Sequence, residues 1–230
     1  CDETLEAFLI VLEAQLLLPL DKDKVIELAS QIDLLLERGF RIDEAHNVVY
    51  YAELLERNRI EGLMEQLLVS HEDLLDQYKT DNEKEIELLL ALGEKYKVPA
   101  AVRAAGRSYA DHPFRWSSED PEKIAFVFAN HEEHEAARQT ILNCFSEEEI
   151  HRKQDLWGPL ALFSFHSGHW EEAWDIIERF WGQIEELPFR NNAMMVRGVC
   201  AYHLGRPGEA LACFEEIGRA SCRERVCVGV

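Results

Sequence analysis

Apolar residues recur at steps of three and four positions along almost the whole chain, and no stretch shows a sustained strand-like alternation. This spacing is typical of amphipathic helices. The segment 169–184 shows it most plainly, because one helical face collects its apolar residues: Trp170, Ala173, Trp174, Ile177, Phe180, Trp181 and Ile184. The sequence therefore predicts an all-α fold, with helices over about 3–18, 22–38, 43–57, 60–78, 82–95, 99–110, 121–130, 133–145, 147–166, 169–184, 190–204 and 207–217.

Several residues indicate where these helices begin and end. Thr80 with Glu83, and Ser146 with Glu149, fit the capping box, in which the two side chains satisfy backbone N–H groups of the first turn. Glycine adopts the left-handed conformation at low cost, so it often follows the last residue of a helix. We expect such helix ends at three positions: Gly39, Gly168 and Gly205.

Composition and charge limit the class of protein. The chain has 230 residues, 47% of them hydrophobic and 30% charged, so it can bury a sizeable core in one or two domains. Its 24 Lys and Arg against 44 Asp and Glu give a formal net charge of −20. Such a surface repels phosphate backbones, so we expect no nucleic-acid partner. The acidic residues are scattered over solvated helix faces, which indicates a soluble surface, and a dedicated patch for a basic partner is the alternative.

Small residues recur at a nearly constant interval in the second half of the chain. Four alanines lie 36, 36 and 37 residues apart: Ala101, Ala137, Ala173 and Ala210. A second small residue lies twelve positions before each of the last three: Ala125, Ala161 and Gly198. A large side chain where two antiparallel helices cross would push them apart, so this pattern predicts tight hairpins. Hairpins in tandem bury their faces only against neighbours, and they therefore stack into one core.

In this register, residues of about 85–217 resemble the tetratricopeptide repeat, a helix hairpin of about 34 residues. The unit at 191–217 matches best, with Gly198, Tyr202 (one position late), Leu204, Gly205, Ala210 and Phe214. The preceding unit carries Trp157, Leu160, Ala161, Gly168, Ala173 and a late Pro188, and the units at 85–113 and 121–144 match more weakly. The resemblance implies a right-handed α-solenoid of antiparallel helix hairpins. An irregular helical bundle is the alternative.

We expect three segments: degenerate repeat-like helices over 1–80, tetratricopeptide-like repeats over 81–217, and a tail over 218–230. Residues of about 216–230, which include EIGRASCRERV, resemble the translation of a sequencing adapter, so we interpret the tail as an artefact. A genuine basic tail is the alternative. Cys1 stands where a Met would begin a chain, which we interpret as a truncation, with a lipid-bearing Cys as the alternative. We expect a cytoplasmic protein with no membrane span, because the run from Ala7 to Leu20 is short and interrupted by polar residues.

The resemblance implies that the first helix of each hairpin lines a concave groove. Transferred position by position, the partner-binding candidates are Phe126, Asn130, Leu162, Phe165, His166, Asn192, Met195, Val199, Tyr202 and His203. Apolar and aromatic side chains with polar donors suit an extended peptide or a helix. We therefore expect a protein–protein interaction module with no catalytic residue, cofactor or metal. Packing of some of these side chains between repeats is the alternative.

Two other functions stay open at this point: a sensor or regulatory arm of a larger enzyme or transcriptional regulator, and a helical metal-dependent enzyme. The segment His131-Glu132-Glu133-His134 places two histidines at i and i+3, whereas a zinc-protease helix needs i and i+4. Cys200 and Cys213 are expected to pack as small apolar residues. One subtype of the family holds a C-terminal carboxylate with Lys and Asn, but Gly158 and Met195 occupy those positions, so that ligand is not predicted.

Overall fold

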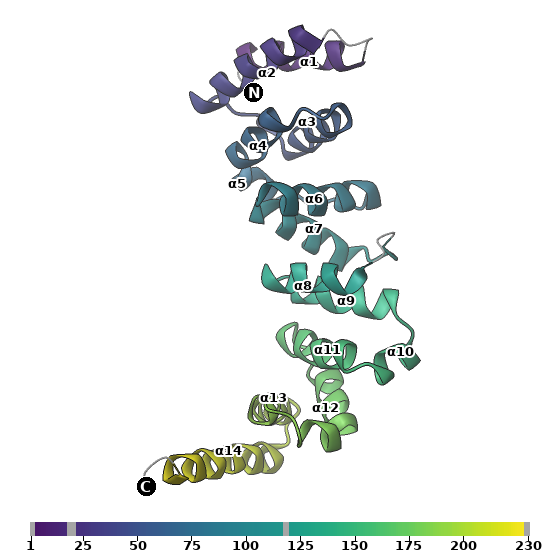
Figure 1. The fold of residues 1–230 in the computed structure, drawn as a ribbon, viewed down its shortest axis with the longest axis vertical. Coiled ribbons are helices and arrows are strands. Elements are labelled where there is room, and N and C mark those ends of the chain that lie inside the picture. The colour runs from purple at the N-terminus through teal and green to yellow at the C-terminus, as the bar shows by residue number, and fades with distance from the viewer. Residues whose placement is uncertain (1–2, 18–21, 117–119, 228–230) are drawn as a thin grey trace. The chain divides into compact units, whose positions relative to one another are not determined.

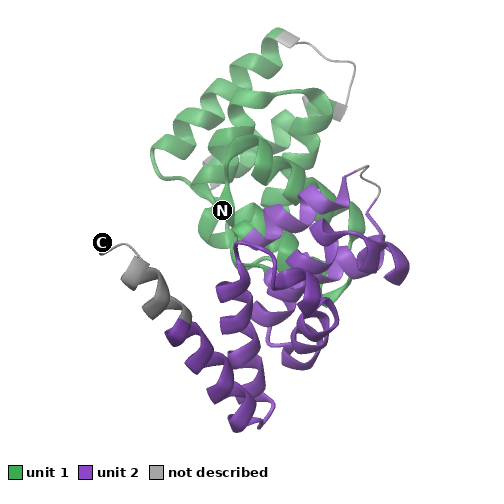
Figure 2. Ribbon diagram, turned by 60° about the horizontal axis from the view of Figure 1, so that its bottom comes forward, with its two compact units in different colours: residues 1–114, 130–133 green, residues 115–129, 134–230 purple. Residues whose placement is uncertain are grey.

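The structure is a computed structural model that describes residues 3–17, 22–116 and 120–227, with backbone only after Arg219. Within these ranges the protein is all-α, with fourteen helices and no strand (Figure 1). None of the described helices is both long enough and apolar enough to cross a bilayer. The chain divides into two compact units, residues 1–114 with 130–133 and residues 115–129 with 134–230, coloured green and purple in Figure 2.

The first unit contains α1 to α7. Their bounds are Glu3–Leu17, Lys22–Glu37, Ala45–Asn58, Glu61–Ser70, Glu72–Leu75, Glu83–Tyr96 and Pro99–Asp111. Neighbours along the chain pack together, α1 with α2, α3 with α4 and α6 with α7, and α2 also packs on α4. The buried residues that fill these contacts are mostly Leu, Ile, Val and Ala, as the three- and four-residue spacing predicts.

The second unit contains α9 to α14 and all of α8 except its last residue. The bounds of α8 to α14 are Pro121–Asn130, His134–Cys144, Glu147–Arg152, Gln154–His166, Trp170–Ile184, Arg190–His203 and Pro207–Cys227. The helix pairs α11 with α12, α12 with α13 and α13 with α14 pack closely, and α9 packs on α11. This unit therefore also builds its core mainly from neighbours in the sequence.

The small residues of the predicted register are buried. Four of them have no exposed surface: Ala101, Ala125, Ala137 and Ala173. Ala161 and Ala210 are 6% and 4% exposed. A Cβ built on Gly198 would lie 2.8 Å from Cε1 of Phe214 and 3.1 Å from Cβ of Cys213, so this glycine lets α13 approach α14. The predicted small residues are therefore buried, and the prediction that they lie at helix contacts is confirmed at Gly198.

The predicted helix ends are confirmed in part. Ser146 and Glu149 form the expected capping box, in which the Ser146 N–H donates to Glu149 Oε2 at 2.9 Å. Left-handed φ angles of 94°, 84° and 72° occur at the three predicted glycines: Gly39, Gly168 and Gly205. The capping box of Thr80 with Glu83 is wrong. Asn82 caps α6, because it lies directly before the helix and its Oδ1 accepts the Lys84 N–H at 3.1 Å.

Two of the predicted helices are each divided in two. The helix expected over 60–78 breaks at His71, whose buried ring is fixed by two hydrogen bonds. Its Nε2 accepts the Ile42 N–H at 2.8 Å, and its Nδ1 lies 2.8 Å from the Leu67 carbonyl oxygen. The helix expected over 147–166 breaks at Lys153, which has an extended backbone and precedes α11. In both cases a single non-helical residue reorients the next helix without a loop.

The last helix is longer than predicted. The sequence predicts an end at 217, but α14 continues to Cys227. Residues 219–227 contain Arg, Ala, Ser, Cys, Glu and Val and no proline, so nothing in them stops a helix that has already formed. Residues 228–230 and the side chains after Arg219 lie outside the described part, and the adapter origin of the tail stays a prediction.

Candidate functional site

None of the ten predicted partner-binding residues is buried. Phe165 and Val199 are half-buried, and the other eight are exposed: Phe126, Asn130, Leu162, His166, Asn192, Met195, Tyr202 and His203. The structure separates them into two groups and three single positions. Asn130 ends α8 and belongs to the first unit, and Met195 and Val199 lie on α13 outside both groups.

The first group lines a cavity of about 510 Å³ in the second unit, which we call the apolar cavity. Phe126 comes from α8, Leu162 from α11 and Asn192 from α13. The buried residues Trp157, Ile177 and Val196 also line it, together with Ala161, Ile184, Ala193 and Phe189. The volume lies within the range of about 300–1,000 Å³ that is usual for ligand pockets.

Several large apolar side chains of this cavity face solvent. Phe126 is 46% exposed, Leu162 47% and Phe189 40%. Gly158 and Pro159 of α11 also line the cavity, and a Cβ built on Gly158 would meet no atom within 4 Å. A contiguous exposed apolar area of this kind is uncommon on a surface that contacts only water. The arrangement can therefore accept apolar side chains from another molecule.

The charged residues of the apolar cavity are both acidic. Glu122 in the first turn of α8 and Asp155 in the first turn of α11 line it, and no Lys or Arg does so among the described residues. Neither carboxylate has a hydrogen-bond or ion-pair partner within the described part of the chain. Sequence reasoning missed both, because each looks like an ordinary solvated residue at a helix start.

The second group consists of Phe165, His166, Tyr202 and His203, at the ends of α11 and α13. Together with Trp170, the first residue of α12, these four residues form what we call the aromatic cluster. The rings of Trp170 and His203 stack at 4.1 Å with an interplanar angle of 6°, and Phe165 meets Trp170 edge-on at 5.4 Å. His166 also stacks on His134 of α9 at 4.5 Å. These contacts connect α9 with α11, α11 with α12 and α12 with α13, so much of the cluster serves packing. Tyr202 is the main exception, since it is 69% exposed.

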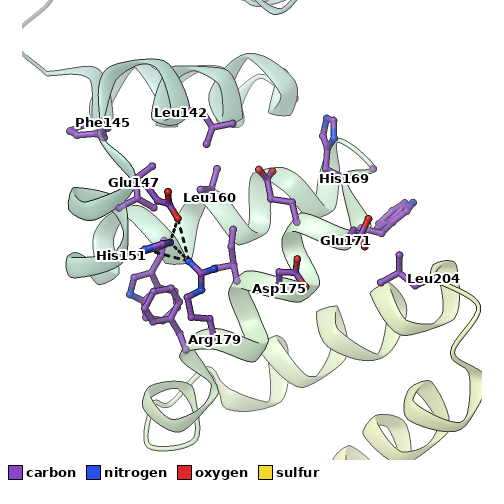
Figure 3. A pocket seen from close by; sticks show the side chains of 17 residues that line it. Leu142, Phe145, Glu147, His151, Leu160, His169, Glu171, Asp175, Arg179 and Leu204 are labelled. Atoms are coloured by element: carbon purple, nitrogen blue, oxygen red, sulfur yellow. Dashed lines mark hydrogen bonds and ion pairs between the residues drawn. The ribbon is translucent and has the colours of Figure 1, made fainter.

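A larger and more polar cavity of about 910 Å³ lies among α9, α10, α11 and α12 (Figure 3). At one end, Oε1 of Glu147 lies 3.8 Å from Nε2 of His151 and 3.9 Å from Nη1 of Arg179. Arg179 also donates a hydrogen bond to the His151 ring. At the other end are the side chains of His169 and Glu171 (Figure 3). The three side chains at the first end pair with one another and connect α10 with α12, which accounts for their positions without a ligand.

Ion pairs that the sequence did not predict connect the helices around this polar cavity. Arg138 of α9 donates to Glu172 of α12 at 2.5 Å and to Glu135 at 3.0 Å. Ser164 of α11 donates to Glu172 at 2.7 Å. Burial alone would raise the pKa of Glu172, but the hydrogen bonds from Arg138 and Ser164 outweigh it and lower that pKa. The carboxylate is therefore charged and holds three helices together.

The histidine pair considered for metal binding has other contacts. Glu132 has a left-handed φ of 65°, so the segment spans a turn and not one helix. Glu133 accepts a hydrogen bond from Arg107 at 3.3 Å, and His134 stacks on the His166 ring. Within the described ranges, no group of three or more His, Cys, Asp or Glu is arranged to hold a metal ion.

Cys200 of α13 and Cys213 of α14 pack as predicted. Cys200 has no exposed surface, and Cys213 is 5% exposed. Burial raises the pKa of the Cys200 thiol to about 11 and raises that of Cys213 as well. Both thiols therefore stay protonated near neutral pH and behave as small apolar groups.

Comparisons of the chain with protein-family models, with curated proteins and with solved structures found no match. The function must therefore be inferred from the cavities, contacts and charges of the chain's own residues.

Proposed function

We propose that this chain is a tetratricopeptide-like repeat array that binds a peptide or helix of a partner protein. The register of buried small residues and the close pairing of α11 with α12 and α13 with α14 support the repeat assignment. The finer arrangement as a right-handed α-solenoid belongs to this proposal. The assignment of the chain as an interaction module, and not as an enzyme, is also part of this proposal.

The observation that carries the proposal is the apolar cavity. Its walls come mainly from α8, α11 and α13, the first helices of three successive hairpins in the predicted register, and Ile177 and Ile184 of α12 also contribute to the lining. In such an array the first helices line the concave face, and this fits the exposure of Phe126 and Leu162 and the position of the Asn192 amide at the cavity. An amphipathic helix or extended peptide binds such a surface by inserting apolar side chains.

Selection of peptides from a random phage-displayed library tests this function. Peptides selected on the full chain should lose binding to Leu162→Asp, because a carboxylate in the cavity wall opposes burial of apolar side chains. Leu211→Asp is the matched control, since Leu211 is 59% exposed on α14 and does not line the cavity. Recovery of no binding peptide, or peptides that bind both variants as well as the original chain, would contradict the proposal.

The aromatic cluster supplies a second check. Tyr202→Ala combined with His203→Ala should weaken binding of the selected peptides and leave helical circular dichroism nearly unchanged. Because Trp170 stacks on His203, a loss of helicity in this double variant would mean that these residues hold the hairpins together and do not contact the partner.

A further inference from the structure

The charge of the apolar cavity points to one kind of partner. Glu122 and Asp155 lie on neighbouring first helices and leave two carboxylates without a cationic partner among the described residues. Lys123 and Lys153 are close to them in sequence but do not line the cavity. In the polar cavity, by contrast, Glu147 is paired with Arg179. The acidic groups of the apolar cavity are therefore available to a ligand.

A backbone acceptor lies beside one of these carboxylates. Pro159 has no N–H, so it cannot donate the helical hydrogen bond that the Asp155 carbonyl would otherwise accept four residues earlier. The Asp155 carboxylate, and the carbonyl that lacks this donor, are both hydrogen-bond acceptors. A guanidinium or ammonium group can form a charge-assisted hydrogen bond with the Asp155 carboxylate, whereas an acidic side chain is repelled by it.

From this arrangement, and resting on the proposed function, we infer that the partner segment is a basic amphipathic peptide. Its apolar side chains fill the space between Phe126, Leu162 and Phe189, and its Lys or Arg side chains pair with Glu122 and Asp155. The net charge of −20 on the whole chain attracts such a segment before contact. The cavity then discriminates by apolar fit and by the two carboxylates, while acidic segments are repelled.

Four fluorescently labelled synthetic peptides test the inference. Three share the same leucine stripe at helical spacing and carry flanking Lys, Gln or Glu, and the fourth has the Lys composition in an order that destroys the stripe. Fluorescence anisotropy with the full chain should show that affinity decreases from the Lys peptide to the Gln peptide to the Glu peptide among the three with the stripe. The scrambled Lys peptide should bind more weakly than the striped Lys peptide. The preference for Lys should decrease as salt is added.

Two matched pairs of substitutions locate the effect. Glu122→Gln with Asp155→Asn should weaken the Lys peptide about 2- to 30-fold, the range expected for losing two solvent-exposed ion pairs. The same pair of changes should leave the Gln peptide within about twofold. Glu209→Gln with Glu215→Gln removes the same charge from exposed positions on α14, and it should change neither peptide by more than about twofold.

The outcomes separate this inference from the proposed function. Equal binding of the Lys, Gln and Glu peptides, equal loss from both pairs of substitutions, or equal binding of the scrambled Lys peptide would each overturn the inference. If the Gln peptide still binds and Leu162→Asp still abolishes that binding, the interaction function stands. If no striped peptide binds the chain, both are contradicted.

Discussion

Substitution of Gly93 by alanine tests whether the absence of a side chain fixes the α6–α7 contact. A Cβ on Gly93 would lie 2.7 Å from Cγ2 of Val102 and 2.9 Å from its backbone nitrogen, both inside van der Waals contact. Rotation of the Val102 side chain can relieve the first clash, but the nitrogen belongs to the backbone of α7, so the helices must separate. Overpacking of this kind costs about 1–3 kcal/mol, and the better helix propensity of alanine offsets about 1 kcal/mol.

We therefore expect Gly93→Ala to lower the free energy of unfolding by about 0–2 kcal/mol, measured by urea unfolding followed with far-ultraviolet circular dichroism. Gly62→Ala is the control in the same unit, because a Cβ on Gly62 meets no atom within 4 Å. That control should be unchanged or up to about 1 kcal/mol more stable. Adding Val102→Ala to Gly93→Ala removes one of the two clashes. The double variant should therefore lose less stability than the sum of the losses in the two single variants. Equal stabilisation by both glycine substitutions would refute the reasoning.

Three further predictions concern buried side chains. Ala173→Leu should overpack the contact of α12 and lower the free energy of unfolding by about 1–3 kcal/mol, and an unchanged urea midpoint would contradict this. Burial lowers the pKa of His71, so as pH falls the unfolded chain binds a proton on this histidine before the folded chain does. The free energy of unfolding should therefore decrease as pH falls below about 6.5, and a pH series of unfolding measurements should show a smaller decrease for His71→Leu. The Cys200 thiol, with its pKa raised to about 11, should react with a thiol reagent far more slowly than half-buried Cys144 in the folded chain, and equal rates would show that Cys200 is accessible.

The helices could be predicted because their causes are local. The apolar face of 169–184 and the small residues spaced about 36 apart are legible without knowing any distant contact. The break at His71 could not be predicted in this way, since it depends on a hydrogen bond from Ile42, 29 positions earlier. The cap of α6 was missed because Thr80 and Asn82 are both good capping residues, and only the backbone shows which one precedes the helix.

The candidate site was predictable in part for a similar reason. The exposure of the Phe126 and Leu162 side chains could be predicted from the proposed repeat register alone. Phe189 could not, because it lies in the connection between α12 and α13, where no periodicity applies. The proposed roles of Glu122 and Asp155 depend on the lack, in the described part of the chain, of a cationic side chain within reach of their carboxylates, and only the folded structure shows which side chains are within reach.

The pairing of each helix with its neighbours in the sequence has a consequence for how the protein is made. When α6 packs on α7, or α13 on α14, the partner surface is available as soon as the second helix has been synthesised. Contacts between such near segments close short loops at low entropic cost and form quickly. Each such pair of helices can thus acquire its native contacts while the ribosome is still translating the next helices, which shortens the time that its apolar faces are open to aggregation.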